Sequence, residues 1–239
     1  MTEIRPDEHD WVFDLIAEDE ASRKAALDRH RALLEEFSAA QQRTNRFLTE
    51  AAMPVPGRLH VATEFDRAFA AQQAVKIKTL FGPLAAFFEA ESAPVRAVYA
   101  PYALLFLQWE RRYPDEWREA GTWTSSPWTP KELSLARLAR DGVPAAHSDE
   151  VARLVIAAVE GPYRCKDWRY APLARRVDGQ DLRGRLGALA EHTNPLTRLR
   201  VQFLVHLLDN PSQRITRKTW RRWLQRVKGR ESAASDNPA

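Results

Sequence analysis

Apolar residues recur every three to four positions along nearly the whole chain of 239 residues, and this spacing limits the possible folds. In residues 22–51, for example, Leu27, Leu34 and Phe37 recur at helical spacing. No segment alternates polar and apolar residues with the period of two that is typical of a strand. The 9 glycines include no Asn-Gly or Asp-Gly pair between strand-like runs. The pattern predicts an all-α protein without a sheet.

Proline and glycine divide this helical pattern into segments, because neither residue continues a helix well. Ser92 and Asn194 each precede a proline and an apolar run, as helix N-caps do. We predict roughly ten helices, arranged as an irregular multi-helix bundle or a short array of helical hairpins. The main predicted helices are 7–18, 22–51, 62–80, 92–112, 129–140, 149–160, 170–177, 181–192, 195–208 and 216–229.

Charge is distributed unevenly along the chain. Residues 1–60 carry 8 Lys and Arg against 12 Asp and Glu, whereas residues 161–230 carry 17 against 5. We predict an acidic N-terminal helical part at 1–120, a tryptophan-containing loop at 121–130, a basic C-terminal helical part at 131–230 and a disordered tail at 231–239. The basic part is typical of a surface that meets a polyanion.

Motifs for nucleotide, metal or covalent chemistry are missing. No glycine-rich phosphate loop follows a strand, the six histidines form no zinc-binding motif, and Cys165 is the only cysteine. We therefore expect no cofactor, no metal and no dedicated catalytic residue. One cysteine and the absence of a leader-like N-terminus favour a cytoplasmic protein. The longest apolar run, 97–109, is too short to span a bilayer, so no membrane contact is expected.

The last predicted helix contains the strongest functional signal. Residues 216–229 hold six basic residues, two tryptophans and no acid. On a helical projection, Trp220, Trp223, Leu224 and Val227 share one arc, and the basic residues occupy the opposite side. The apolar arc predicts a docking face, which leaves the basic side to contact backbone phosphates. The basic residues are Arg217, Lys218, Arg221, Arg222, Arg226 and Lys228.

A second basic segment, 162–176, interleaves cations with aromatic rings. Aromatic side chains stack on bases while neighbouring cations hold phosphates, as in proteins that bind single strands. This pattern predicts phosphate contacts from Arg164, Lys166, Arg169, Arg175 and Arg176, with base stacking by Trp168 and Tyr170. The alternative is that both rings pack in the core and the arginines surround them.

These observations favour a non-catalytic protein that binds DNA or RNA, as an accessory subunit of a larger nucleoprotein complex. The N-terminal helices would then serve architecture, self-association or a protein partner. The first alternative is a protein-interaction scaffold whose basic face meets an acidic partner. The sequence does not distinguish DNA from RNA, and it assigns no cellular process.

A helical ribonuclease of the HEPN class is the second alternative. Proteins of that superfamily carry an Arg followed, after four to six residues, by a His, and Arg200 and His206 have this spacing. The spacing occurs at three other places in this arginine-rich chain, and Val201 stands where the superfamily usually has a polar residue. The match remains an alternative and not an assignment.

Three tryptophans, Trp117, Trp123 and Trp128, flank or lie in the least helical stretch of the chain. Exposed tryptophans are common at binding sites. Tryptophans also attach long loops to a core. Both interpretations remain open at the level of sequence.

Overall fold

The computed structural model describes residues 6–51, 58–120 and 126–235, with side chains at all of these except 48–51, 58–62, 228 and 230–235. Every element in these residues is helical, and no strand occurs among them, so the predicted all-α class is confirmed. The chain divides into two compact units, residues 1–134 and 135–239, with the division inside helix α6 (Trp128–Asp141). Unit 1 has a net charge of −5 and unit 2 of +9.

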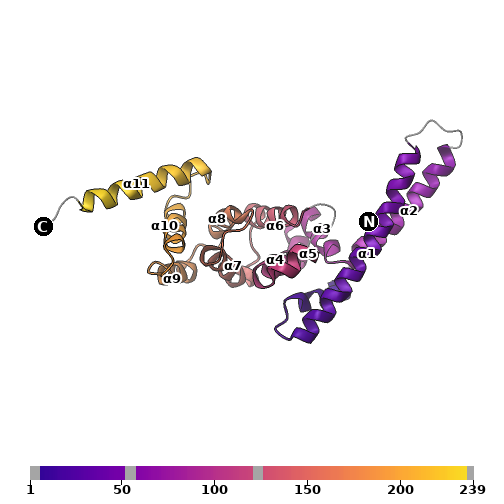
Figure 1. The fold of residues 1–239 in the computed structure, drawn as a ribbon, viewed down its shortest axis with the longest axis horizontal. Helices are drawn as coiled ribbons and strands as arrows, with labels where there is room; N and C mark the ends of the chain where they lie inside the picture. Colours follow the sequence, from indigo (N-terminus) through magenta and orange to yellow (C-terminus); the bar gives the residue numbers. More distant parts are fainter. Residues whose placement is uncertain (1–5, 52–57, 121–125, 236–239) are drawn as a thin grey trace. The chain divides into compact units, whose positions relative to one another are not determined.

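Unit 1 begins with the short helix η1 (Pro6–Ile16), followed by a long antiparallel hairpin of α1 (Glu20–Ala51) and α2 (Arg58–Lys78) (Figure 1). Its remaining helices are α3 (Phe81–Glu89), α4 (Ala93–Arg112) and α5 (Pro114–Ala120). The core gathers large aromatic residues from α3, α4 and α5, with the Phe106 ring 5.5 Å from that of Trp117.

The first helix differs from the sequence expectation in type. Residues Pro6–Ile16 form a 3-10 helix and not an α-helix. His9, Val12 and Leu15 are its buried residues, and they follow one another at intervals of three. A 3-10 helix has three residues per turn, so this spacing places all three side chains on one line facing α1 and α4.

Unit 2 packs four helices around a shared apolar core: α7 (Ser148–Glu160), α8 (Tyr170–Ala174), α9 (Gln180–Ala188) and α10 (Pro195–Asp209). Val155, Leu173, Leu186 and Leu207 are wholly buried in it. Two 3-10 turns, η2 (Ala145–His147) and η3 (Asp167–Arg169), connect elements of this unit.

Several predicted helix ends have the expected chemistry. The Ser92 side chain accepts a hydrogen bond from the Val95 N–H, and that of Asn194 accepts one from the Leu196 N–H at 2.9 Å. Gly142 ends α6 with a φ of 95°, a backbone conformation that favours glycine.

The last helix, α11 (Arg217–Ser235), is longer than expected. It continues five residues into the segment predicted as a tail, and residues 236–239 lie outside the described residues. Its first turn is capped, because the Thr216 Oγ1 atom accepts a hydrogen bond from the Thr219 N–H at 3.1 Å.

Candidate nucleic-acid interface

An aromatic joint made by Phe203, His206, Trp220 and Trp223 packs the first turns of α11 against α10. The Phe203 ring lies 4.8 Å from that of Trp220, nearly perpendicular to it, and 5.1 Å from that of Trp223. The His206 ring stacks on Trp223 at 6.5 Å. Trp223 is only 7% exposed as a result. The joint therefore uses the two tryptophans at the start of the docking arc, while Leu224 and Val227 are half-buried.

The opposite side of α11 is a cationic face made by Arg217, Lys218, Arg221, Arg222 and Arg226, all of which are exposed. Four of these side chains, together with Gln225, line a shallow open depression. The sixth predicted residue, Lys228, has a side chain outside the described residues. The tryptophan rings of the joint contact α10, and the cationic face lies on the exposed side of the helix.

The stretch of sequence that carries the cationic face contains no acidic residue. No Asp or Glu occurs between Asn210 and Arg230 in the sequence. Within the described residues, no ion pair involves any cation of the face. Some arginines elsewhere in unit 2 do form ion pairs: Arg183 lies 2.7 Å from both Asp178 and Asp209, and Arg185 lies 2.6 Å from Asp149. The cations of α11 differ from these arginines in having no acidic partner among the described residues.

The position of these cations on the helix adds to their mutual repulsion. Arg217 and Lys218 stand in the first turn of α11, where the helix dipole is positive and basic residues are unfavourable. Anions are favoured at the same place. The local electrostatics of the cationic face thus oppose folding when it is empty and favour a bound anion.

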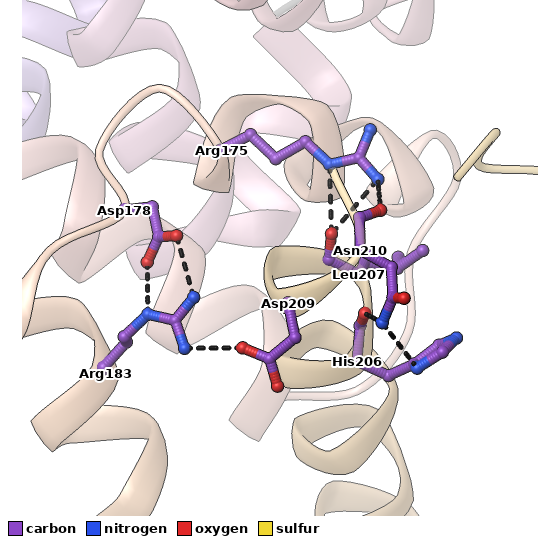
Figure 2. A network of polar contacts seen from close by, with 7 residues as sticks. All are labelled: Arg175, Asp178, Arg183, His206, Leu207, Asp209 and Asn210. Carbon is purple, nitrogen blue, oxygen red and sulfur yellow. Dashed lines mark hydrogen bonds and ion pairs between the residues drawn. The ribbon is translucent and has the colours of Figure 1, made fainter. Parts of the chain in front are cut away.

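Arg175, expected to contact phosphate, is instead engaged with the main chain (Figure 2). Its guanidinium donates hydrogen bonds to the main-chain oxygens of Leu207 and Asn210 at 3.2–3.3 Å, as Figure 2 shows. A further hydrogen bond goes to the main-chain oxygen of Gln213 at 2.8 Å. These carbonyl groups lie at the end of α10 and in the turn that leads to α11. Partial burial lowers the pKa of Arg175. We therefore remove Arg175 from the phosphate-binding set, because its donors satisfy the carbonyl groups that α10 leaves open.

Arg176 has a similar structural role. Its guanidinium donates hydrogen bonds to the main-chain oxygens of Ala139 and Arg140, at the C-terminal end of α6. Cations near a helix C-terminus satisfy its last carbonyl groups and interact favourably with the dipole. The basic pattern of residues 162–176 therefore mixes two kinds of arginine, and sequence spacing does not separate them.

The other predicted residues of this segment lie in the 161–169 loop between α7 and α8. Trp168 is 42% exposed, with the Arg169 guanidinium 4.2 Å from its ring centroid, whereas Tyr170 is only 3% exposed. Tyr170 packs in the unit 2 core, and its ring is not accessible for stacking on a base. Tyr163, which belongs to the same interleaved pattern but was not one of the two predicted stacking residues, is 60% exposed. Arg164, Lys166 and Arg169 are half-buried at this loop.

Arg200 and His206, the residues of the ribonuclease alternative, have separate surroundings. The Arg200 guanidinium donates hydrogen bonds to the main-chain oxygens of Val159 and Gly161, where α7 ends. His206 belongs to the aromatic joint, and its Nδ1 atom lies 3.2 Å from the side-chain nitrogen of Asn210. Six residues apart on α10, the two side chains leave the helix about 120° apart. No shared site brings them together.

Two of the three tryptophans near the predicted loop are described. Trp117 is buried in α5, and its ring lies 5.0 Å from that of Trp128 at the start of α6. This contact attaches the start of α6 to the unit 1 core, as the packed-loop interpretation predicts. Trp123 lies outside the described residues.

Among the described residues, no group of three or more His, Cys, Asp or Glu side chains is placed to hold a metal ion. No described helix combines the length and the apolar character needed to cross a membrane. Cys165 is exposed in the 161–169 loop.

Comparison with known proteins found no matching family model, no matching curated protein and no matching solved structure.

Proposed function

We propose that this chain is a non-catalytic nucleic-acid-binding protein that holds backbone phosphates with the cationic face of α11. One observation supports this above the others: five exposed cations lie on one side of a docked helix with no ion pair among the described residues. Most charged protein surfaces carry both basic and acidic residues, because neighbouring cations repel one another unless an anion lies close to them. A phosphate backbone supplies the missing charge.

The spacing of the cationic face suits a regular polyanion. Lys218, Arg222 and Arg226 follow one another every four residues, which places them about 6 Å apart along the helix axis. Arg217 and Arg221 form a neighbouring row with the same interval. Arginine forms two parallel hydrogen bonds with a phosphate group, and four of the five cations are arginines. The face is long enough for several consecutive phosphates.

The aromatic joint argues against a membrane-surface helix. A basic amphipathic helix binds a bilayer by inserting its apolar side between the lipids. On α11, Trp223 is buried against α10 and is not available for insertion. The scaffold alternative, in which the basic face meets an acidic protein, uses the same charges and differs in predicting no salt-dependent binding to random-sequence nucleic acid beyond a weak background. For the ribonuclease alternative, no contact in the structure favours Arg200 and His206 as partners.

Salt dependence provides the decisive measurement. Five phosphate contacts release counterions, so the logarithm of the binding constant should fall against the logarithm of salt concentration with a slope of about −4 to −5 for a duplex and about −3 to −4 for a single strand. Fluorescence anisotropy with random-sequence DNA and RNA, each single-stranded and duplex, measures this slope. A scaffold for an acidic protein should show no such slope.

The variant Arg221→Glu with Arg222→Glu tests the surface itself. We expect it to abolish binding at salt concentrations where the unaltered chain binds, because two attractive charges become repulsive. Arg43→Glu with Arg46→Glu provides the matched control, since it makes the same change in net charge at exposed positions of α1 in unit 1. Equal loss in both variants would indicate a nonspecific effect of net charge and contradict the proposal.

The acidic unit 1 has a structural role that is separate from phosphate binding. Its long α1–α2 hairpin provides architecture, self-association or a contact with a protein partner, as in accessory subunits of nucleoprotein complexes. Light scattering of the full chain, with and without a bound oligonucleotide, measures its association state. Loss of association after charge reversals in α1 would support this role, with nucleic-acid affinity of the monomer unchanged.

A further inference from the structure

The 161–169 loop exposes two aromatic rings beside basic residues, at the only described non-glycine position with a positive φ. Lys166 has a φ of 68°, in the left-handed region that residues with a Cβ atom adopt at some cost. Tyr163 and Trp168 lie on either side of this residue and are 60% and 42% exposed. Large aromatic side chains are mostly buried in helical domains, so two exposed rings in one short loop need an explanation.

The exposure does not come from a loosely held segment. The buried carboxylate of Asp167 accepts a hydrogen bond from the Arg164 N–H at 2.7 Å, and the Arg169 N–H donates to the Lys166 main-chain oxygen. Arg200 of α10 donates to the Gly161 main-chain oxygen at 2.6 Å. The loop is therefore attached to α10 and to its own turn while Tyr163 and Trp168 remain exposed, an arrangement suited to binding with little loss of entropy.

We infer that Tyr163 and Trp168 form a base-stacking platform, and that the preferred ligand of this protein is a single-stranded nucleic acid. This inference rests on the proposed function of α11. Stacking on an aromatic ring needs an exposed base face, which a single strand offers and a duplex does not. The Arg169 guanidinium lies over the Trp168 ring and supports a stacked base with its positive charge.

The platform and the cationic face are both attached to α10. Arg200 contacts the loop, and Phe203, three residues further on, packs against Trp220 of α11. Residues three apart lie on the same side of a helix on successive turns. One side of α10 thus contacts both the 161–169 loop and α11 within unit 2, so the aromatic rings and the cationic face are attached to the same helix.

A cycle of variants and oligonucleotides without bases tests the inference. One ligand is a 12-nucleotide single strand, and the other has the same sugar-phosphate backbone with the central bases removed. For the unaltered chain, removing the bases should weaken binding by about 5- to 150-fold, the range for loss of one stacked base. For Trp168→Ala the difference between the two strands should become clearly smaller, because only the Tyr163 ring remains to stack on a base. Tyr163→Ala should reduce the difference in the same way, and Trp168→Phe should retain most of it.

Leu196→Ala is the matched control, because Leu196 is another exposed apolar residue of unit 2, at the start of α10. It should keep the full effect of removing the bases. Thermal unfolding confirms that each variant is folded. If both strands bind the unaltered chain equally, and Arg221→Glu with Arg222→Glu abolishes this binding, the stacking inference is wrong and the phosphate-binding function stands.

Two other outcomes distinguish the remaining possibilities. If neither strand nor a duplex binds at low salt, the proposed function itself is wrong, and the inference fails with it. If duplex and single strand bind equally and Trp168→Ala changes neither, the exposed rings serve no nucleic acid, and a protein contact explains them. Tyrosine, tryptophan and arginine are also the residues most enriched at the energetic centres of protein interfaces, so this last result would favour the scaffold alternative.

Discussion

The guanidinium of Arg175 donates two hydrogen bonds to the main-chain oxygen of Leu207, through Nε at 3.3 Å and a terminal nitrogen at 3.2 Å. This contact joins α8 to the end of α10, just before the turn that begins α11. Next to it, Arg183 joins Asp178 to Asp209 (Figure 2). Arg175 and Arg183 thus both hold the C-terminal end of α10, from which the chain continues into α11.

Arg175→Ala should therefore destabilise unit 2 and leave phosphate contacts intact. Removing the side chain leaves carbonyl groups at the end of α10 unsatisfied, which costs about 1–3 kcal/mol of unfolding free energy. Arg175→Lys should recover only part of this, because an ammonium group cannot donate to three carbonyl groups in the geometry of a guanidinium. Urea unfolding measures the effect. Arg221→Ala is the control, and its unfolding free energy should change by less than about 0.5 kcal/mol.

Trp223→Ala should release α11 from α10. The Trp223 ring contacts Phe203 and His206, and losing a buried tryptophan costs up to about 3–5 kcal/mol. Hydrogen exchange should then become faster in α11 amides and remain unchanged in α7 amides. Protection of α11 equal to that in the unaltered chain would show that other contacts hold the helix.

Arginines of the cationic face and arginines that cap helices should differ in their effect on salt dependence. Arg222→Ala should lower the magnitude of the slope of log binding constant against log salt by about one. Arg176→Ala should leave the slope unchanged, because its guanidinium contacts the end of α6. Anisotropy titrations at four salt concentrations measure both. Equal slopes for the two variants would contradict the division of the arginines made here.

His30 should make the stability of unit 1 depend on pH. Burial lowers the pKa of His30 to about 4, against the opposing effect of a hydrogen bond with the Ala120 main-chain oxygen. His30 is therefore protonated near pH 6.5 in the unfolded chain and only near pH 4 in the folded chain. Stability should fall by about 2 kcal/mol between pH 7 and pH 5 and should level off below pH 4.

His30→Gln tests this pH dependence, since glutamine keeps a hydrogen-bond donor and does not titrate. The unfolding free energy of His30→Gln minus that of the unaltered chain should increase as the pH falls from 7 to 5, because only the unaltered chain loses stability through this histidine. Parallel curves for the two proteins over this range would show that another group is responsible. Circular dichroism with urea at each pH provides the measurement.

Replacing one member of the Glu110–Lys131 ion pair should lower the unfolding free energy more than replacing both. The two side chains are 1% and 0% exposed and lie 3.0 Å apart, with Arg111 3.5 Å from the other carboxylate oxygen. Removing one charge of a buried pair costs about 3–5 kcal/mol, because the remaining charge stays buried without its partner. Lys131→Met alone should therefore cost more than Lys131→Met combined with Glu110→Gln. Additive effects in urea unfolding would argue against coupling.

Local features of the chain could be predicted because they depend on neighbours in sequence. Helical periodicity, the caps at Ser92 and Asn194, and the two sides of α11 all involve residues within one or two turns. The 3-10 helix at Pro6–Ile16 was missed because its type depends on packing of His9, Val12 and Leu15 against distant helices. Similarly, a lysine is expected at the surface, and Lys131 is buried because Glu110 pairs with it in the folded chain.

Composition and short-range spacing were sufficient to predict the helical class, the charge difference between the two ends and the opposite apolar and basic sides of α11. Which cations remain available depends on contacts between helices that are distant in sequence. A guanidinium binds a carbonyl group, a carboxylate or a phosphate with the same donors. Arg175 and Arg176 are engaged because α10 and α6 end beside them, and Arg221 is exposed because Trp220 and Trp223 turn the other side of α11 towards Phe203. Tyr163 and Tyr170 differ for the same reason: they are near in sequence, but only Tyr170 lies in the core of unit 2.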